Sequence, residues 1–250
     1  MDVEDEGTVV CFSGGIDSTV VLLDMFQAHG PEKVVAMGAN YGQPHKHELA
    51  VGAAFCKSRG IPYEEVPISF SLSGCAGRRE ALSPGEAEVF YDAQRREGKV
   101  HRDHRDIVGR NLHIVAAASV VAHHHGFGKI AMGCNLEDGQ GEDSHDKDSV
   151  RGGFQDCTES YFKALSIALQ YGGGPRIITP LINMTKKEVV QRAVMLGIDL
   201  NKTWSCFFPQ WIMGGPPEVC GVCGACISTQ EATEGVQHQR ESVEGVGDKA

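Results

Sequence analysis

The chain has 250 residues, 41% of them hydrophobic, and a formal net charge of −10. This length and composition allow one α/β core with a small annex. This negative charge argues against direct binding of nucleic acid, because such binding needs positive side chains that neutralise phosphates. It favours a small-molecule substrate. Because no apolar run reaches the length of a membrane span and the N-terminus is acidic, we expect a cytoplasmic protein with no membrane partner.

The first predicted unit is a strand, a turn and a helix near the N-terminus. Residues 9–12 form an apolar run that predicts a buried strand, residues 13–15 predict a turn and residues 20–26 predict a helix. Adjacent glycines let main-chain N–H groups face an anion, while nearby hydroxyls and the start of the helix add further donors. This stretch therefore predicts a phosphate-binding loop, with a simple capped turn as the alternative.

The loop has neither the Walker A spacing nor its lysine. The sequence Ser-Gly-Gly-Ile-Asp-Ser at residues 13–18 resembles instead the loop of the ATP pyrophosphatases, which activate a substrate oxygen as an adenylate and release pyrophosphate. In that resemblance Asp17 helps to place Mg²⁺, and the loop stabilises the departing pyrophosphate. The residues that it assigns to ATP are Ser13, Gly14, Gly15, Asp17, Ser18 and Thr19.

Strands and helices alternate along the rest of the chain. Further strands are predicted at 33–38, 61–68, 129–133 and 177–178, and helices at 45–58, 108–126, 158–171 and 185–197, the last with a capping box at Thr185 and Glu188. This alternation predicts an α/β fold with a doubly wound, Rossmann-like parallel sheet. Two stretches lack periodicity: 71–106, a long excursion with some helix, and 135–153, an acidic loop that does not match the EF-hand spacing.

Four cysteines cluster towards the end of the chain, at Cys206, Cys220, Cys223 and Cys226. Four thiolates with two overlapping C-x-x-C pairs suit a tetrahedral structural zinc site, while an iron–sulfur cluster and a redox dithiol are alternatives. We therefore divide the chain into a disordered N-terminus (1–7), a nucleotide-binding domain (8–200), a small Cys₄ zinc-binding appendage (201–230) and a disordered tail (231–250).

Five motifs, in this order, are similar to those of the 7-cyano-7-deazaguanine synthases: residues 13–19, Tyr-Gly-Gln-Pro-His-Lys-His-Glu at 41–48, Gly-Arg-Asn at 109–111, Gly-Phe-Gln-Asp-Cys at 153–157, and Thr-Trp-Ser-Cys at 203–206 with the cysteine cluster. The resemblance implies an adenine nucleotide alpha-hydrolase-like fold and an ATP-dependent carbon–nitrogen ligase. Such an enzyme adenylates 7-carboxy-7-deazaguanine, forms an amide with ammonia, and dehydrates it to the nitrile of queuosine biosynthesis. The resemblance also implies Mg²⁺, a structural zinc and a homodimer.

Roles for individual side chains follow from this chemistry. A carboxylate satisfies both donors of a guanine-like edge, which favours Asp156, although an aspartate there also suits a helix cap. Arg110 would neutralise phosphate or the substrate carboxylate. We expect Asn111 to join Asp17 and Arg110 in catalysis. Gln43, His45, Asn111 and Phe154 are assigned to nucleotide, ammonia or base contacts, with Phe154 stacking on the base.

Alternatives remain at the level of function. The family's usual Pro-Gly-Arg-Asn is Val-Gly-Arg-Asn at 108–111, and its usual Gly-Tyr-Pro-Asp-Cys is Gly-Phe-Gln-Asp-Cys at 153–157. A related ligase would use the same adenylation but stop at the amide, or join the deazaguanine to a protein or other acceptor in DNA modification or antiphage defence. A non-catalytic nucleotide-binding partner and a sulfur-transferring tRNA modifier are further hypotheses, the last disfavoured by the net charge.

Overall fold

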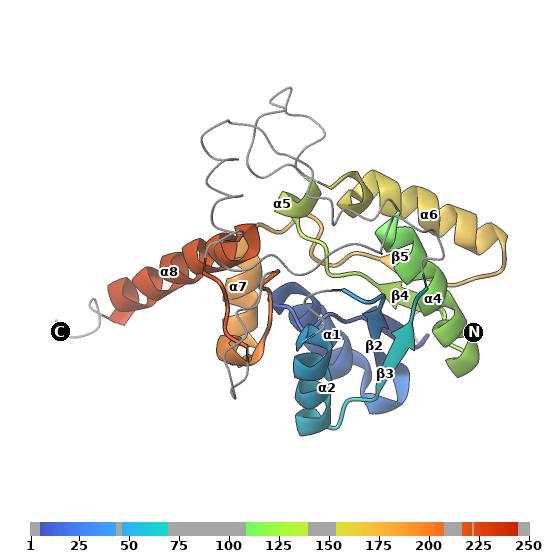
Figure 1. The fold of residues 1–250 in the computed structure, drawn as a ribbon, viewed down its shortest axis with the longest axis horizontal. Helices are drawn as coiled ribbons and strands as arrows, with labels where there is room; N and C mark the ends of the chain where they lie inside the picture. Colours follow the sequence, from blue (N-terminus) through green and yellow to red (C-terminus); the bar gives the residue numbers. More distant parts are fainter. Residues whose placement is uncertain are drawn as a thin grey trace.

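The computed structural model describes residues 6–43, 47–69, 109–139, 154–207, 217–221 and 223–244. Its strands are β1 (Thr8–Cys11), β2 (Val34–Asn40), β3 (Tyr63–Pro67), β4 (Lys129–Ala131) and β5 (Arg176–Ile178), shown in Figure 1. Its α-helices are α1 (Ile16–His29), α2 (His47–Arg59), α4 (Arg110–His125), α5 (Leu136–Gly139), α6 (Glu159–Tyr171), α7 (Lys186–Met195) and α8 (Gly224–Glu244). Short 3₁₀ helices are η2 (Pro31–Lys33), η3 (Gln155–Cys157) and η4 (Leu200–Lys202).

The five strands form one parallel sheet in the order β3-β2-β1-β4-β5. Thr8 of β1 pairs with Val34 of β2 on one side and with Lys129 of β4 on the other. The chain moves outward from β1 to β3 and then returns to the opposite side of β1. In open parallel sheets, ligands bind beyond the carboxyl ends of the strands at such a reversal. The predicted doubly wound sheet is confirmed, and β1 and β4 mark where a site is expected.

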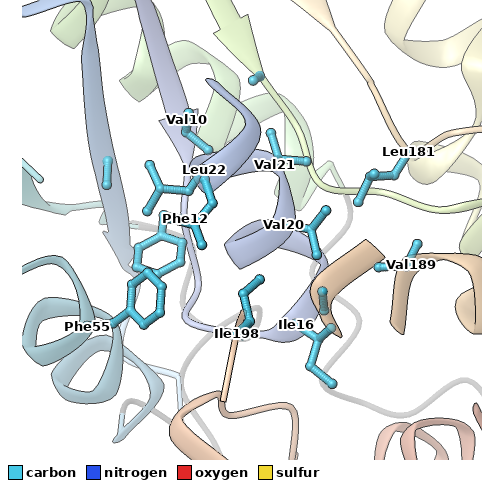
Figure 2. Packing of buried hydrophobic residues seen from close by; sticks show 14 of the residues in the cluster. Val10, Phe12, Ile16, Val20, Val21, Leu22, Phe55, Leu181, Val189 and Ile198 are labelled. Atoms are coloured by element: carbon cyan, nitrogen blue, oxygen red, sulfur yellow. The ribbon is translucent and has the colours of Figure 1, made fainter. Parts of the chain in front are cut away.

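Both faces of the central strands are buried. Val10 packs with α1, α2 and α7 on one face, whereas Val9 packs with α4 and α6 on the other. Figure 2 shows side chains of α1 lying between Val10 of β1 and Val189 of α7. Strands covered on both faces read as continuous apolar runs without alternation, which explains why residues 9–12 stood out in the sequence.

The predicted helix start at Thr185 is confirmed in detail. The Thr185 hydroxyl accepts from the Glu188 backbone N–H at 3.3 Å, and the Glu188 carboxylate accepts from the Thr185 backbone N–H at 2.7 Å. Both bonds of a capping box are therefore present. These two bonds fix the first turn of α7. Lys186 belongs to that turn, so its backbone position is fixed as well.

The predicted disordered tail is wrong for residues 231–244, because α8 continues to Glu244. The helix packs against α7, and Ala232 is buried in the same core as α1 and α7. A side-chain hydrogen bond of 2.9 Å from Gln230 to Glu234, one turn later, also supports it. A polar helix with a narrow buried stripe gives weak periodicity, and this is why the sequence did not indicate it.

Several predictions fall outside the described residues: His45, the excursion at 71–106 and most of the acidic stretch at 135–153. The described start of that stretch is not simply loop, since Leu136–Gly139 form the short helix α5. Among the described residues, no helix combines the length and apolar character needed to cross a membrane.

Candidate active site and metal centre

The predicted phosphate-binding loop lies between β1 and α1. Gly14 has a φ of +85°, and a Cβ atom there would stand 2.7 Å from the carbonyl oxygen of Glu48 in α2. On another side, the backbone N–H of Trp204 donates to the carbonyl of Gly14 at 2.8 Å. Glycine is needed both for the left-handed conformation and for the space. The loop is thus held between α2 and the segment that leads to the cysteine cluster.

The loop hydroxyls brace the loop itself. The Thr19 hydroxyl donates to the carbonyl of Gly15 at 2.7 Å, and the Ser18 hydroxyl donates to the same carbonyl at 3.1 Å. The Ser13 backbone N–H donates to the Ser18 oxygen at 3.3 Å. Ser18 and Thr19 are buried, so the structure gives them a supporting role. Their predicted contact with phosphate stays a prediction.

Asp17 is the centre of a polar cluster at the carboxyl ends of β1 and β4. Its two carboxylate oxygens accept from Asn135 Nδ2 at 3.0 Å and from Lys186 Nζ at 2.5 Å. Asn135 in turn accepts from the backbone N–H groups of Glu137 and Asp138, and Glu137 accepts from the backbone N–H of Lys186. Three separate segments, at the starts of α1, α5 and α7, therefore meet on one carboxylate.

Asp138 adds a second carboxyl group to this cluster. Burial and the nearby Asp17 charge raise the pKa of Asp138 to about 6, while the N–H of Asn135 and the Lys186 ammonium oppose the rise. The close approach of β4 to α1 depends on Gly133, because a Cβ there would lie 3.0 Å from Ser18 backbone atoms. The site concentrates carboxylates and one buried ammonium beside the loop, which is the chemistry expected where phosphates and a divalent cation bind.

A second cluster joins Arg110 and Asn111 at the start of α4 to the 3₁₀ turn η3. The Asn111 backbone N–H donates to Asp156 Oδ2 at 3.3 Å, and its side chain donates to the Asp156 carbonyl at 2.8 Å. The guanidinium of Arg110 is largely buried, which lowers its pKa, but Tyr41, Cys157 and Asp156 outweigh this and the net pKa is raised. Arg110, Asn111 and Asp156, predicted separately, are thus brought together.

Phe154 lies next to this cluster and is 42% exposed. Its backbone N–H donates to the Asp138 carbonyl at 2.7 Å. The segment that holds Asp156 is therefore tied to the segment that holds Asp138. An aromatic ring that is open to solvent beside polar groups is available to stack on a planar ligand.

Gln43 is almost completely buried and binds protein groups. Its side-chain N–H₂ donates to the Ala39 carbonyl and to Glu48 Oε1, both at 3.1 Å, and its oxygen accepts from the Tyr41 N–H at 3.0 Å. Burial raises the pKa of Glu48 to about 7, although Gln43 and Arg110 lower it in part. In the structure Gln43 acts as a support for Glu48. Its predicted ligand contact stays a prediction, and that of His45 lies outside the described residues.

The four predicted metal-binding cysteines lie together, with their Sγ atoms all within 4.8 Å of one another. The Sγ atoms of Cys220 and Cys226 are 3.9 Å apart, and a tetrahedral zinc site with Zn–S bonds of ~2.3 Å spaces its sulfurs by about 3.8 Å. Backbone N–H groups also donate to Cys206 Sγ at 3.2 Å and to Cys220 Sγ at 3.4 Å, which favours thiolates. The cluster suits a metal such as zinc.

This cluster is connected to the phosphate-binding loop through Trp204. The indole N–H of Trp204 donates to the Cys206 carbonyl at 3.0 Å, and its ring packs against the cysteines. Its backbone N–H is the one that donates to Gly14. A single residue, Trp204, therefore links the cysteine cluster to the phosphate-binding loop.

Sequence reasoning missed Asn135, Lys186, Asp138 and Glu48. Lys186 was seen only as part of a capping motif, and Asn135 and Asp138 only as part of an acidic loop. The available signal was position: Asn135 follows β4 closely, and Lys186 is buried in the first turn of α7. Buried charged residues rarely occur without a partner, but the sequence alone does not identify that partner.

The fold and the loop define the class of protein. A parallel sheet that reverses at β1, with a Ser-Gly-Gly loop at that point, is the arrangement of the ATP pyrophosphatase (PP-loop) superfamily. The family model described as queuosine biosynthesis protein QueC matches residues 7–237, and the chain therefore belongs to the QueC family.

Curated relatives cover nearly the whole chain. A 7-cyano-7-deazaguanine synthase of Cyanothece sp. is 31% identical over 87% of this chain and 90% of its own. A protein named 7-cyano-7-deazaguanine synthase 2, from Rhodopseudomonas palustris, is 29% identical over 87% of this chain and 92% of its own. Among solved structures, the U34-tRNA thiolase NcsA of Methanococcus maripaludis, with its [4Fe-4S] cluster, has a TM-score of 0.49 and 15% identity, covering 96% of this chain and 68% of that one.

Replacement of Gly14 by alanine is expected to destabilise the protein more than replacement of Gly126. Gly126 is in the left-handed region, with a φ of +68°, and has nothing within 4 Å of an added Cβ, so Gly126→Ala carries only backbone strain of about 1–2 kcal/mol. Gly14→Ala adds a clash with α2. Urea unfolding measures both losses, and nucleotide binding reports on the loop. Equal losses of stability for the two variants would contradict the close packing of the loop on α2.

Replacement of Cys223 by serine is expected to prevent the cluster from holding a metal and to lower the melting temperature, because the cluster loses a buried cysteine ligand. Elemental analysis of the purified protein measures the metal. Cys56→Ser is the matched control. Cys56 is also fully buried, but it lies on α2 in the hydrophobic core, outside the cysteine cluster. Loss of metal from both variants, or from neither, would show that the cluster is not the metal site.

Proposed function

We propose that the chain is an ATP-dependent carbon–nitrogen ligase that adenylates 7-carboxy-7-deazaguanine and, with ammonia, converts it through the amide to 7-cyano-7-deazaguanine. The names of the relatives support the substrate class. The observation that carries the proposal is the hydrogen bond of 2.7 Å between Phe154 and Asp138. It joins the cluster suited to phosphates with the cluster suited to a guanine-like base, so that ATP and the carboxylate would meet at one edge of the sheet.

At the phosphate end, the proposed work is to stabilise the charge that develops on the departing pyrophosphate. The main-chain N–H groups of Gly14 and Gly15 and the positive end of the α1 dipole are suited to this. The Lys186 ammonium, which balances Asp17 in the described structure, would provide further charge. Carboxylates fit Mg²⁺, which commonly takes one or two of them with phosphate oxygens, and a bound ion would supply additional charge stabilisation through Asp17.

At the base end, the Asp156 carboxylate would accept the ring N–H and the amino group of the deazaguanine. Asn111 positions Asp156 through two hydrogen bonds, and Arg110 would hold the carboxylate that is to be adenylated. Phe154 would stack on the base. In this proposal, neighbouring side chains would recognise the base and neutralise its carboxylate.

We extend the proposal to the zinc ion and to the assembly. The four cysteines would hold Zn²⁺ in a closed structural site, because four protein ligands leave no open position for chemistry. The active protein would be a homodimer, as the family resemblance implies. Exposed apolar side chains on α4 and α6, such as Val120 and Tyr171, offer surface for a second copy.

Incubation of the purified protein with 7-carboxy-7-deazaguanine, ATP, Mg²⁺ and ammonium is expected to yield the nitrile with AMP and pyrophosphate. Mass spectrometry identifies the product, and a coupled assay follows pyrophosphate. Amide without nitrile would support the related ligase that stops at the amide or transfers the base to a protein or other acceptor. Absence of pyrophosphate with folded, metal-loaded protein would overturn both forms of the proposal.

Lys186→Met is expected to lower the rate of pyrophosphate release by about 10²-fold or more, because the transition state loses a buried positive charge. Lys187→Met is a closely matched control, since Lys187 is the next residue and is exposed. The rate of substrate-dependent pyrophosphate release measures both. If both variants lowered the rate of pyrophosphate release only slightly and to a similar extent, Lys186 would have no part in stabilising the phosphates.

A further inference from the structure

The carboxyl group of Glu48 has no role in the chemistry described so far. It belongs to the first turn of α2, and its backbone carbonyl packs against Gly14 of the phosphate-binding loop. Gln43 donates to Glu48 Oε1 at 3.1 Å. The amide of Gln43 is itself fixed by the Ala39 carbonyl and the Tyr41 N–H. The orientation of the Glu48 carboxyl group is thus set by a buried, fully bonded amide.

The surroundings of Glu48 come from three other segments of the chain. Arg110 at the start of α4 acts on it electrostatically, as do Tyr41 beyond β2 and Tyr63 of β3. Burial raises the pKa of Glu48 to about 7, and Gln43 and Arg110 oppose the rise. A carboxyl group whose pKa is raised in this way takes up a proton more readily than an exposed one, which suits a residue that accepts and releases protons.

The position of Glu48 links both halves of the site. Its own turn contacts the loop at Gly14, and its neighbour Arg110 also faces Asp156. A group that enters beside Arg110 to attack a carboxylate held there would pass close to Glu48. If Arg110 holds the substrate carboxylate as proposed, Glu48 would lie near the acyl carbon that the nitrogen attacks.

The proposed reaction has a step that no residue yet assigned performs. Near neutral pH the nitrogen source is ammonium, which has no lone pair for attack. We propose that Glu48 binds ammonium and removes its proton, so that ammonia attacks the acyl adenylate. The carbon–nitrogen bond forms, and the nitrogen then gives up a second proton to solvent as the amide is made. The bond between the acyl carbon and the phosphate oxygen breaks, AMP leaves with the electron pair, and the proton held by Glu48 is also released to solvent. This inference rests on the proposed function.

A purely structural role for Glu48 is the competing explanation, because a carboxylate in the first turn stabilises a helix. Glu48→Gln separates the two. It keeps an oxygen to accept from Gln43 and removes the ability to take a proton. Glu65→Gln is the control, since Glu65 is exposed on β3 and its carboxylate accepts a hydrogen bond from the Asn40 side chain.

The experiment compares two nucleophiles at neutral pH. Hydroxylamine is largely uncharged under these conditions and attacks without a base, whereas ammonium must first lose a proton. With 7-carboxy-7-deazaguanine, ATP and Mg²⁺, Glu48→Gln is expected to retain pyrophosphate release and hydroxamate formation and to lose amide formation with ammonium by about 10²-fold or more. The loss is expected to shrink at higher pH, where more ammonia is already neutral. Glu65→Gln is expected to behave as the unchanged protein.

Each other outcome has a distinct meaning. Unchanged amide formation by Glu48→Gln would overturn the role of Glu48 and leave the proposed function standing. Equal loss of amide and hydroxamate would also overturn it, because the defect would then be structural or in adenylation. If the unchanged protein releases no pyrophosphate with this carboxylate, the proposed function fails and the inference fails with it.

Discussion

The contact of Gly14 with two other segments is the constraint on which the site depends. Gly14 lies in the loop that follows β1, α2 is within van der Waals distance of it, and Trp204 donates its backbone N–H to its carbonyl. The same tryptophan packs on the cysteine cluster. Rigidity suits the proposed role of the loop in binding a departing anion, because donors that are already oriented need no reorganisation during a reaction. The hydrophobic core, the phosphate-binding loop and the cysteine cluster are therefore connected through the contacts of Gly14.

The order of the strands brings the remaining groups to this loop. Because β4 pairs directly with β1, the residues that follow β4 reach the start of α1, and Asn135 bonds to Asp17. Lys186 reaches the same carboxylate because the capping box of Thr185 orients the first turn of α7. The buried ion pair would cost stability if either partner were alone. Its presence at a strand end indicates a site in which charge is held ready for a ligand.

Features that depend on local sequence could be predicted, and features that depend on tertiary pairing could not. The strands, the capping box and the four cysteines are visible as runs, spacings and clusters, and the structure contains them. The partners of Asp17 are far away in the sequence, and only the sheet order brings them close. Helix α8 was missed for a related reason: its stability comes from packing on α7 rather than from its own amphipathic pattern.

Two half-buried carboxyl groups of the site have different surroundings. Asp138 lies beside Asp17 and Lys186, next to the loop for phosphates, and burial raises its pKa to about 6. Glu48 lies beside Gln43 and Arg110, and burial raises its pKa to about 7. Enzymes commonly separate the roles of chemically similar groups in this way, by placing them in different environments. Asp138 shares its surroundings with a cation and another carboxylate, which suits the proposed stabilisation of charge on the phosphates, whereas Glu48 lies near Arg110, where the proposed reaction needs a proton removed before a nitrogen can attack.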